Sequence, residues 1–136
     1  MKHQGLVRVG TVYLPVMDVD VAAEWYVNNL HAEVSYKDEE KAILNIANLS
    51  LFLVRSLEEQ SANFFDHNGS ERFSMTFEVD GLCALDALHN EYLQKDMKVG
   101  EIESRGHGGK NFVFYDLDGN MFDVWSELSP TFKEYD

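Results

Sequence analysis

NFVFYDLDGNMFDVW, residues 111–125, is the stretch that decides the predicted fold of this chain. Two runs rich in aromatic and β-branched residues flank Asp118-Gly119, a dipeptide that tolerates the positive φ angles of a tight turn, so the stretch predicts a β-hairpin. Along its second arm, Met121, Asp123 and Trp125 are expected on one face of a sheet, with the residues between them on the other. A single carboxylate between a methionine and a tryptophan is either a rim residue or part of a binding cleft.

The chain is strongly acidic. Its 136 residues include 24 acidic against 11 basic side chains, a net charge of −13. This charge repels the phosphate backbone and anionic membrane surfaces, so we expect neither nucleic acid nor membrane as a partner. The same charge attracts cations and basic partners, or serves only solubility. Hydrophobic residues make up 45% of the chain, which is enough for a folded core.

Cysteine content and the N-terminal sequence bear on the cellular compartment. Cys83 is the only cysteine, which excludes an intramolecular disulfide and a thiolate zinc cluster. The first residues contain no long apolar region and no small-residue cleavage site, and no apolar run is long enough to span a membrane. We therefore expect a cytoplasmic protein.

The first half of the chain predicts a strand, a helix and three further strands. The helix over 21–30 carries an apolar stripe at helical spacing, and Asp18 or Asp20 is its candidate N-cap. The strands are expected over 7–16, 32–37, 42–47 and 49–55.

The same order then repeats. Residues 57–70 have no periodicity and are interpreted as a connection. A strand over 72–79, a helix capped by Asp80, a short strand over 101–104 and the closing hairpin follow. Two βαβββ units with a period of about 65 residues predict a pseudo-symmetric α+β protein. We expect a single domain over 1–136, with modules over about 5–56 and 71–128.

One face of each sheet is expected to carry the helix, which leaves the opposite face open. The open faces are too polar for a core and too aromatic for ordinary surface. Curved toward each other, they would enclose a concave pocket. The candidate ligand-binding residues on these faces are Thr11, Tyr13, Ser74, Thr76, Met121, Asp123 and Trp125, to which the resemblance described next adds Phe52.

Two stretches carry a family resemblance: LPVMDVDVAAEWY over 14–26, followed by Leu30, and DLDGNMFD over 116–123. They resemble the opening and closing signatures of the vicinal oxygen chelate superfamily, which includes glyoxalase I, extradiol dioxygenases, fosfomycin-resistance thiol transferases and bleomycin-resistance proteins. The resemblance implies paired βαβββ modules that form a U-shaped mixed sheet around a cleft, with helices outside, commonly in a homodimer. His31 stands where a helix-ending glycine is frequent, which predicts a left-handed backbone there.

Metal-using members of this superfamily place ligands at four cleft positions, usually His, Gln or Glu. Carried over by motif position, these fall at Thr11, Phe52, Ser74 and Asp123, with Phe73 as the third if the alignment shifts by one. A divalent ion needs at least two or three strong ligands, whereas these positions offer one. We therefore expect no metal and no other cofactor.

Other candidate chemistry leaves alternatives open. The five histidines lack metal spacing, and His107 either reaches the cleft mouth or is solvated. Asp123 either accepts hydrogen bonds from a cationic ligand, beside the rings of Tyr13, Phe52 and Trp125, or is hydrogen-bonded to Thr11 or Ser74 in a wet groove. No partner for a general base is identifiable, so no catalytic residue is predicted.

The leading hypothesis is a metal-free, bleomycin-resistance-like protein that binds a small organic molecule, cationic or aromatic, and acts by sequestration or transport. One alternative is a metal-dependent lyase, thiol transferase or dioxygenase with unrecognised ligands. The other is an interaction module with a closed cleft.

Overall fold

The structure is a computed structural model that describes residues 5–135. The chain divides into two compact units, one ending at Gln60 and the other beginning at Ser61. Each unit contains a four-stranded mixed sheet and one long helix. The predicted α+β class and the repeated βαβββ order are confirmed. Among residues 5–135, none of the helices has the length and apolar character that a membrane-spanning helix needs.

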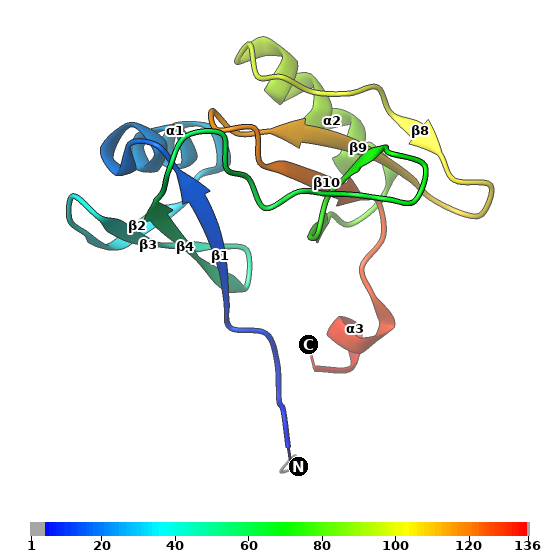
Figure 1. Ribbon diagram of the computed structural model, residues 1–136. Helices are drawn as coiled ribbons and strands as arrows, with labels where there is room; N and C mark the ends of the chain where they lie inside the picture. The colour runs from blue at the N-terminus through cyan, green and yellow to red at the C-terminus, as the bar shows by residue number, and fades with distance from the viewer. Residues whose placement is uncertain (1–4, 136) are drawn as a thin grey trace. The chain divides into compact units, whose positions relative to one another are not determined.

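The first unit is a four-stranded sheet covered on one face by a helix (Figure 1). Its strand order is β1-β4-β3-β2, with β1 parallel to β4 and the other neighbours antiparallel. In chain order its elements are β1 (Thr11–Val16), α1 (Val19–Leu30), β2 (Glu33–Lys37), β3 (Lys41–Ile46) and β4 (Leu49–Arg55).

A single residue caps each end of α1. Asp18 has extended backbone angles, and its carboxylate accepts a 3.1 Å hydrogen bond from the Val21 N–H, so it is the N-cap of the two candidates. At the other end His31 has φ 59° and ψ 32°, which confirms the predicted left-handed residue. Its N–H and that of Ala32 both donate to the Tyr26 carbonyl. Tyr26 itself is fully buried.

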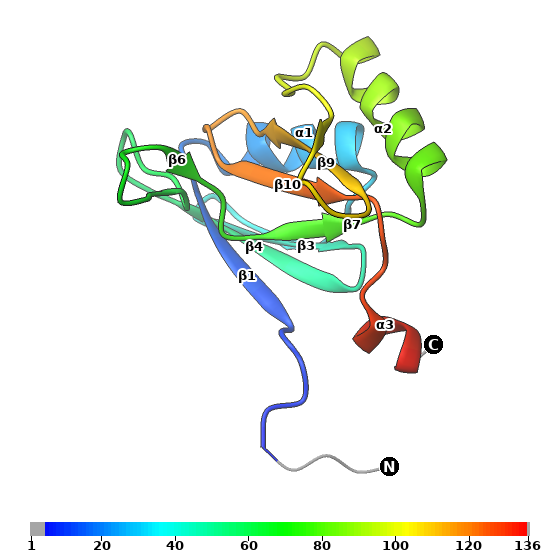
Figure 2. The same cartoon turned by 90° about the vertical axis from the view of Figure 1, so that its right-hand side faces the viewer.

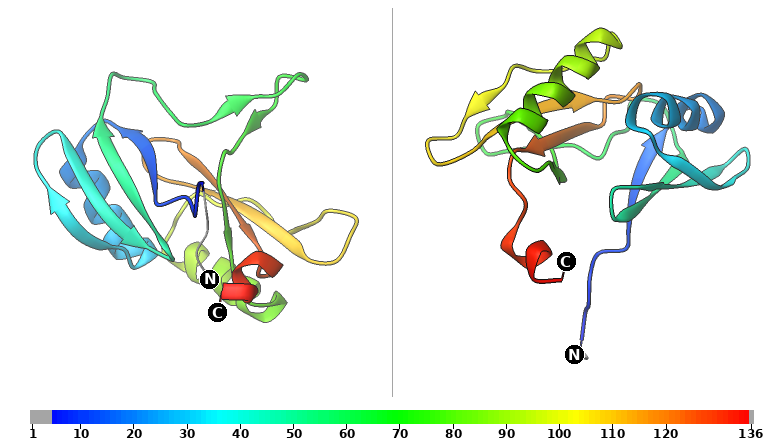
Figure 3. Two further views of the ribbon diagram at one scale, coloured as in Figure 1. Left: turned by 90° about the horizontal axis from the view of Figure 1, so that it is seen from below. Right: turned by 180° about the vertical axis from the view of Figure 1, so that it is seen from behind.

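The second unit repeats this arrangement, with strand order β7-β10-β9-β8 and β7 parallel to β10 (Figure 2). Figure 3 shows α2 lying across one face of its sheet. In chain order the elements are β5 (Phe64–Phe65), β6 (Glu71–Arg72), β7 (Thr76–Glu78), α2 (Leu82–Gln94), β8 (Glu103–Ser104), β9 (Lys110–Tyr115), β10 (Met121–Trp125) and α3 (Pro130–Tyr135).

An aromatic cluster fills the core beneath α2. The ring of Phe114 lies 5.2 Å from that of Phe122 and 5.1 Å from that of Tyr92. Phe112 contacts the ring of Tyr92 edge to face at 6.0 Å. Phe112, Phe114 and Phe122 are each only 1% exposed, so the face of the sheet under α2 is closed to solvent and any ligand must use the other face.

The predicted hairpin of residues 111–125 is confirmed as β9 and β10. Its loop is closed by Asp116, whose Oδ1 accepts hydrogen bonds from the N–H groups of Asp118 at 2.9 Å and Asn120 at 2.8 Å. Gly119 has φ 83°, a value that favours glycine. Asn63 accepts from the Met121 N–H and donates to the Gly119 carbonyl, which ties the preceding connection to this loop.

Several predicted boundaries were wrong. The strand expected over 72–79 is reduced to Thr76–Glu78, because Arg72 pairs instead with Phe64 in a separate two-stranded ladder. The same ladder places the short strand β5 within residues 57–70, which were expected to be an irregular connection. Asp80 does not cap α2: the N-cap residue is Gly81, and no side chain bonds there. The strand expected over 7–16 begins only at Thr11, and α3 was not predicted.

Candidate functional site

The face of the first sheet opposite α1 carries a row of apolar side chains, one from each strand. The strand pairings place Tyr13 beside Phe52, Phe52 beside Ile43, and Ile43 beside Tyr36. Most of the residues that alternate with them along β1, β3 and β4 are buried on the other face: Leu14, Ala42, Leu44, Leu51 and Leu53. This aromatic row, defined as Tyr13, Ile43, Phe52 and Tyr36, is therefore the outward surface of the sheet.

The aromatic row is flat and accessible. The rings of Tyr13 and Phe52 stack with centroids 4.8 Å apart and planes inclined by 21°. Tyr13 is 63% exposed and Tyr36 is 47% exposed, although both side chains are largely apolar. Stacked rings of this kind offer a planar molecule a surface at low cost in conformational entropy.

A row of polar side chains runs beside the aromatic row. Thr11 pairs with Ser50, Ser50 with Asn45, and Asn45 with Glu33. The Ser50 hydroxyl donates a 3.0 Å hydrogen bond to the Asn45 side-chain oxygen. The first sheet thus presents an apolar strip with a hydrogen-bonding border.

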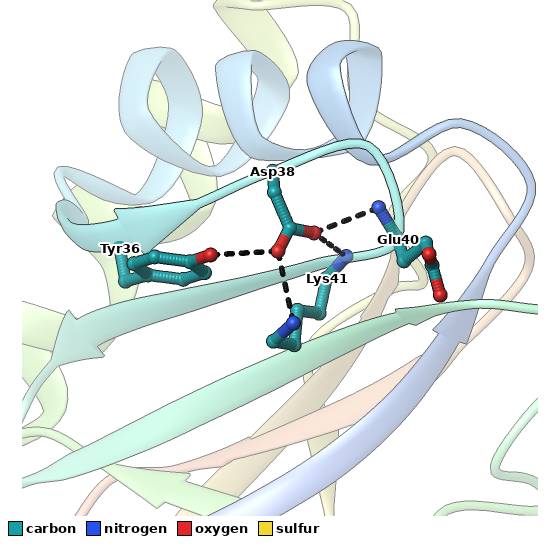
Figure 4. Close-up of polar contacts among 4 residues, drawn as sticks. All are labelled: Tyr36, Asp38, Glu40 and Lys41. Atoms are coloured by element: carbon teal, nitrogen blue, oxygen red, sulfur yellow. Dashed lines mark hydrogen bonds and ion pairs between the residues drawn. The ribbon is translucent and has the colours of Figure 1, made fainter.

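Asp38 fixes the outer end of the aromatic row (Figure 4). Its Oδ2 accepts from the Tyr36 hydroxyl at 2.7 Å and from the Lys41 ammonium at 2.9 Å, while Oδ1 accepts from the N–H groups of Glu40 and Lys41. The bonds from Lys41, Tyr36 and the Glu40 backbone hold the pKa of the Asp38 carboxyl well below its usual range. The same carboxylate raises the pKa of Tyr36 and of Lys41. Tyr36 is thereby held as a neutral phenol at a defined position.

In the second unit the corresponding face carries Asp123. Its carboxylate is 6% exposed and accepts two side-chain hydrogen bonds, from the Asn111 amide to Oδ1 at 2.6 Å and from the Thr76 hydroxyl to Oδ2 at 3.0 Å. Arg105 Nε donates to the Asn111 side-chain oxygen at 2.9 Å. Both oxygens of the Asp123 carboxylate therefore accept hydrogen bonds from within the second unit, and the donors are Thr76 and Asn111 rather than Ser74.

Sequence reasoning missed Asn111 and Arg105. Asn111 pairs with Trp125 across the hairpin, so the period of two along β9 places its side chain on the face that carries Asp123. That signal was present in the sequence. Nothing marked Arg105, which reaches Asn111 from a loop, because loop side chains have no periodicity to follow.

Trp125 lies beneath the loop that joins β8 to β9. A Cβ placed on Gly109 would come within 2.6 Å of the indole ring and 2.5 Å of a Glu127 carboxylate oxygen, and Gly109 has φ 95°. The ring of His107 meets Trp125 edge to face at 5.5 Å, although His107 is exposed. Glycine is thus required where the backbone passes over the tryptophan.

The eight predicted site residues fall into two groups. Thr11, Tyr13 and Phe52 lie together on the helix-free face of the first sheet. Thr76, Met121, Asp123 and Trp125 lie on β7 and β10 of the second sheet, and Ser74 is exposed just before β7. The shared cleft expected from the resemblance stays a prediction.

The four positions at which the resemblance would place metal ligands do not suit a divalent ion. Phe52 has no donor atom, and both oxygens of Asp123 already accept hydrogen bonds. Thr11 and Ser74 offer neutral hydroxyls, which are weak ligands. Within the part of the chain that the structure describes, no three His, Cys, Asp or Glu side chains come together as a metal site would require.

A hollow of about 250 Å³ in the first unit lies at the start of α1, away from the predicted residues. Its lining mixes three carboxylates with one guanidinium, and Asp18 among them already serves as the helix cap. The aromatic row is the better candidate site, because its exposed rings are apolar and none of its residues caps a helix. The lining residues of the hollow are Met17, Asp18, Val19, Asp20, Glu39 and Arg55.

No known protein-family profile matches the sequence, and no curated protein matches it either. Solved structures do match. Lactoylglutathione lyase from Agrobacterium tumefaciens is 16% identical, with a TM-score of 0.71 over 90% of this chain and 96% of that one. The fosfomycin resistance protein FosX from Listeria monocytogenes is 18% identical, with a TM-score of 0.68 over 93% and 96%. TnmS3, an antibiotic binding protein from a Streptomyces species, is 17% identical, with a TM-score of 0.69 over 93% and 100%. At these identities the likeness shows the fold.

Proposed function

From the vicinal oxygen chelate fold of this chain, we propose that it binds a small organic molecule on the helix-free faces of its sheets, without a metal ion. Sequestration or transport of that molecule is the role that follows. The proposal rests mainly on the aromatic row, in which the stacked rings of Tyr13 and Phe52 point outward from the first sheet.

The chemistry of the two faces favours a planar aromatic ligand. A ring laid on Tyr13 and Phe52 gains stacking and removes apolar surface from water. The polar row beside it supplies hydroxyl and amide groups for the ligand's edge. A cationic group on the ligand also suits the exposed ring of Tyr13. The Asp123 carboxylate is a poorer site for a cationic group, because both of its oxygens already accept hydrogen bonds from Thr76 and Asn111.

The printed names of the structural neighbours are compatible with this role. TnmS3 is described as an antibiotic binding protein, and FosX as a fosfomycin resistance protein. Binding without turnover needs no catalytic residue, and we propose none on the helix-free face of either sheet. We further propose a cytoplasmic homodimer: the single cysteine favours the cytoplasm, and the family resemblance favours the dimer.

The test begins with a thermal-shift screen of the chelator-treated full chain against planar aromatic compounds that are neutral, cationic or anionic. A compound that stabilises the protein is then titrated calorimetrically into wild type, Phe52→Leu and Phe64→Leu. Leucine in place of Phe52 keeps an apolar side chain but loses the ring, so the affinity should fall roughly tenfold. Phe64 is an exposed phenylalanine on β5 and serves as the matched control, with no change expected. Equal affinities in all three proteins, or no stabilising compound, would overturn the proposal.

A further inference from the structure

Arg105 is anchored by one nitrogen of its guanidinium and exposed at the rest of it. Its Nε donates a 2.9 Å hydrogen bond to the side-chain oxygen of Asn111. Within the part of the chain that the structure describes, Nη1 and Nη2 of Arg105 have no hydrogen-bond or ion-pair partner. The two terminal nitrogens are therefore available to a group from outside the chain.

The group that anchors Arg105 is itself fixed. Asn111 is 3% exposed, and its side-chain nitrogen donates to Oδ1 of Asp123, which is 6% exposed. The Thr76 hydroxyl holds the other oxygen of that carboxylate. A buried chain of hydrogen bonds thus runs from the second sheet to the base of an exposed guanidinium. Because Nε is anchored, the side chain loses less rotational freedom when Nη1 and Nη2 bind a partner.

The strand register places Arg105 on the helix-free side of the second sheet. Asn111 pairs with Trp125 on β10 and with Glu103 on β8. Trp125 points away from α2, since its neighbour Val124 is buried on the other face. Arg105 follows Glu103 by two residues and so extends the same face of β8. The guanidinium therefore stands above the helix-free face, where a ligand has access.

The loop that contains Arg105 is basic and open. Residues 105–110 read Arg-Gly-His-Gly-Gly-Lys and include no acidic side chain, whereas the whole chain has a net charge of −13. Figure 1 shows this loop projecting past the ends of β8 and β9. A Cβ on Gly106 would meet nothing within 4 Å. An anion that approaches Arg105 thus meets local positive charge and open space.

Two acidic residues lie close enough to the loop to matter. Glu103 is the cross-strand partner of Asn111, and a Glu127 carboxylate oxygen lies 2.5 Å from the position that a Cβ on Gly109 would take. Among residues 5–135, neither carboxylate forms a salt bridge with Arg105. The guanidinium charge is thus not neutralised by direct contact with either acid.

We propose that Arg105 binds an oxyanion, the carboxylate or phosphate group of a small molecule, through Nη1 and Nη2 above the helix-free face of the second sheet. Two parallel N–H···O bonds from the planar guanidinium match the geometry of either group. Asp123 then serves the ligand indirectly, because it fixes the arginine through Asn111. The inference goes beyond the proposed function, since Arg105 belongs to the second unit and the aromatic row to the first.

The test is an NMR titration of inorganic phosphate, and separately of acetate, into the full chain at constant ionic strength. The chain has two tryptophans, so the indole N–H signal of Trp125 reports on the site, and that of Trp25 on α1 is the internal reference. We expect a saturable shift of the Arg105 Nε–H and Trp125 signals with at least one anion, without a shift of Trp25. The anion that binds identifies the group. No saturable shift with either anion would overturn the proposal.

Two substitutions separate the geometry of the guanidinium from its charge. Arg105→Gln removes both, whereas Arg105→Lys keeps the charge but loses the planar pair of donors. Both should weaken binding, followed on the Trp125 signal, about tenfold or more, because a hydrogen bond between charged groups is lost. Arg72→Gln is the matched control, since Arg72 is exposed in the same unit and lies over the Phe73 ring. Wild-type affinity in Arg105→Lys would overturn the proposal.

Asn111→Ala tests the positioning role, because it keeps the guanidinium but removes the acceptor of its Nε–H. The affinity should fall about two- to tenfold, since the freed side chain must now be ordered on binding. The Arg105 Nε–H signal should move to the shift of a solvated arginine, which a general loss of stability would not cause. An unchanged signal would overturn the positioning role. The calorimetric titration of aromatic compounds is independent of these results, so the two proposals can fail separately.

Discussion

The side-chain amide of Asn111 donates a 2.6 Å hydrogen bond to Oδ1 of the buried Asp123, from the adjacent strand of the same hairpin. Thr76 supplies the second bond, and Arg105 holds the other end of Asn111. The carboxylate that the family resemblance would offer to a metal is thus engaged by the protein's own donors.

Asn111→Ala should lower the free energy of unfolding by about 1–3 kcal/mol, because it leaves one oxygen of a buried carboxylate without its donor. Asn45→Ala is the control, since Asn45 is exposed and only accepts a surface hydrogen bond from Ser50. Its effect should stay within about 0.5 kcal/mol. Urea unfolding measures both. Equal effects of the two substitutions would contradict the role given to Asn111.

Gly109→Ala should disturb the loop over Trp125, because the new methyl group would meet the indole and the Glu127 carboxylate. Gly106→Ala is the matched control: Gly106 also has a positive φ, of 84°, but open space around its Cβ position. Both should lose about 1 kcal/mol or more to backbone strain, while only Gly109→Ala should shift the tryptophan fluorescence. An unchanged emission spectrum for Gly109→Ala would show that the backbone does not lie on the ring.

His31→Gly should stabilise the protein by about 0.5–1 kcal/mol, because glycine adopts the left-handed angles at the end of α1 without a Cβ penalty. His31→Ala separates this effect from any contact of the imidazole, since alanine removes the ring and keeps the Cβ. Thermal unfolding should rank glycine above alanine. If alanine matches glycine, the backbone is not strained there.

Asp38→Asn should change how stability depends on pH. The folded-state pKa of Asp38 lies below the value of about 3.9 expected in the unfolded chain. Its carboxylate therefore stabilises the fold fully above that unfolded value, and the contribution is lost as pH falls through the folded pKa. The difference in unfolding free energy between wild type and Asp38→Asn should be constant from pH 7 to about 5 and shrink below about 4.

A second variant checks the cause of that pH dependence. Tyr36→Phe removes one of the donors to Asp38 but leaves the Lys41 ammonium and the backbone N–H groups. The difference in unfolding free energy between wild type and Tyr36→Phe, measured by urea unfolding, should also shrink as pH falls below about 4. It should be smaller than the difference between wild type and Asp38→Asn. A difference between wild type and Asp38→Asn that stays constant down to the lowest pH at which the protein folds would show that Asp38 has no special stabilisation.

Much of the fold could be predicted from the sequence because local signals agreed with one another. The Asp-Gly turn between two aromatic runs specified the β9–β10 hairpin, and the N-cap of α1 is Asp18, one of the two candidates that the sequence offered. The errors lie where a distant contact overrides a local pattern. Residues 72–79 alternate like one strand, yet Arg72 pairs with Phe64 and only Thr76–Glu78 pairs with β10.

The candidate site could be predicted in part. Alternation along single strands placed Tyr13 and Asp123 on helix-free faces, and the family resemblance added Phe52. The sequence did not specify the partners of Asp123, because those depend on the register between strands and on a loop arginine. Nor did it show that Ile43 and Tyr36 extend the aromatic row, since that row crosses four strands and follows from their pairing.

The most direct test of the central claim is calorimetric titration of Zn²⁺, Ni²⁺, Mn²⁺ and Fe²⁺ into chelator-treated full chain, with and without a planar aromatic ligand found by the thermal-shift screen. We expect no stoichiometric metal binding and the same ligand affinity in every case, because Phe52 has no donor atom and both oxygens of Asp123 already accept hydrogen bonds. One tightly held ion per chain that is lost in Asp123→Asn, or ligand binding that requires the metal, would contradict it.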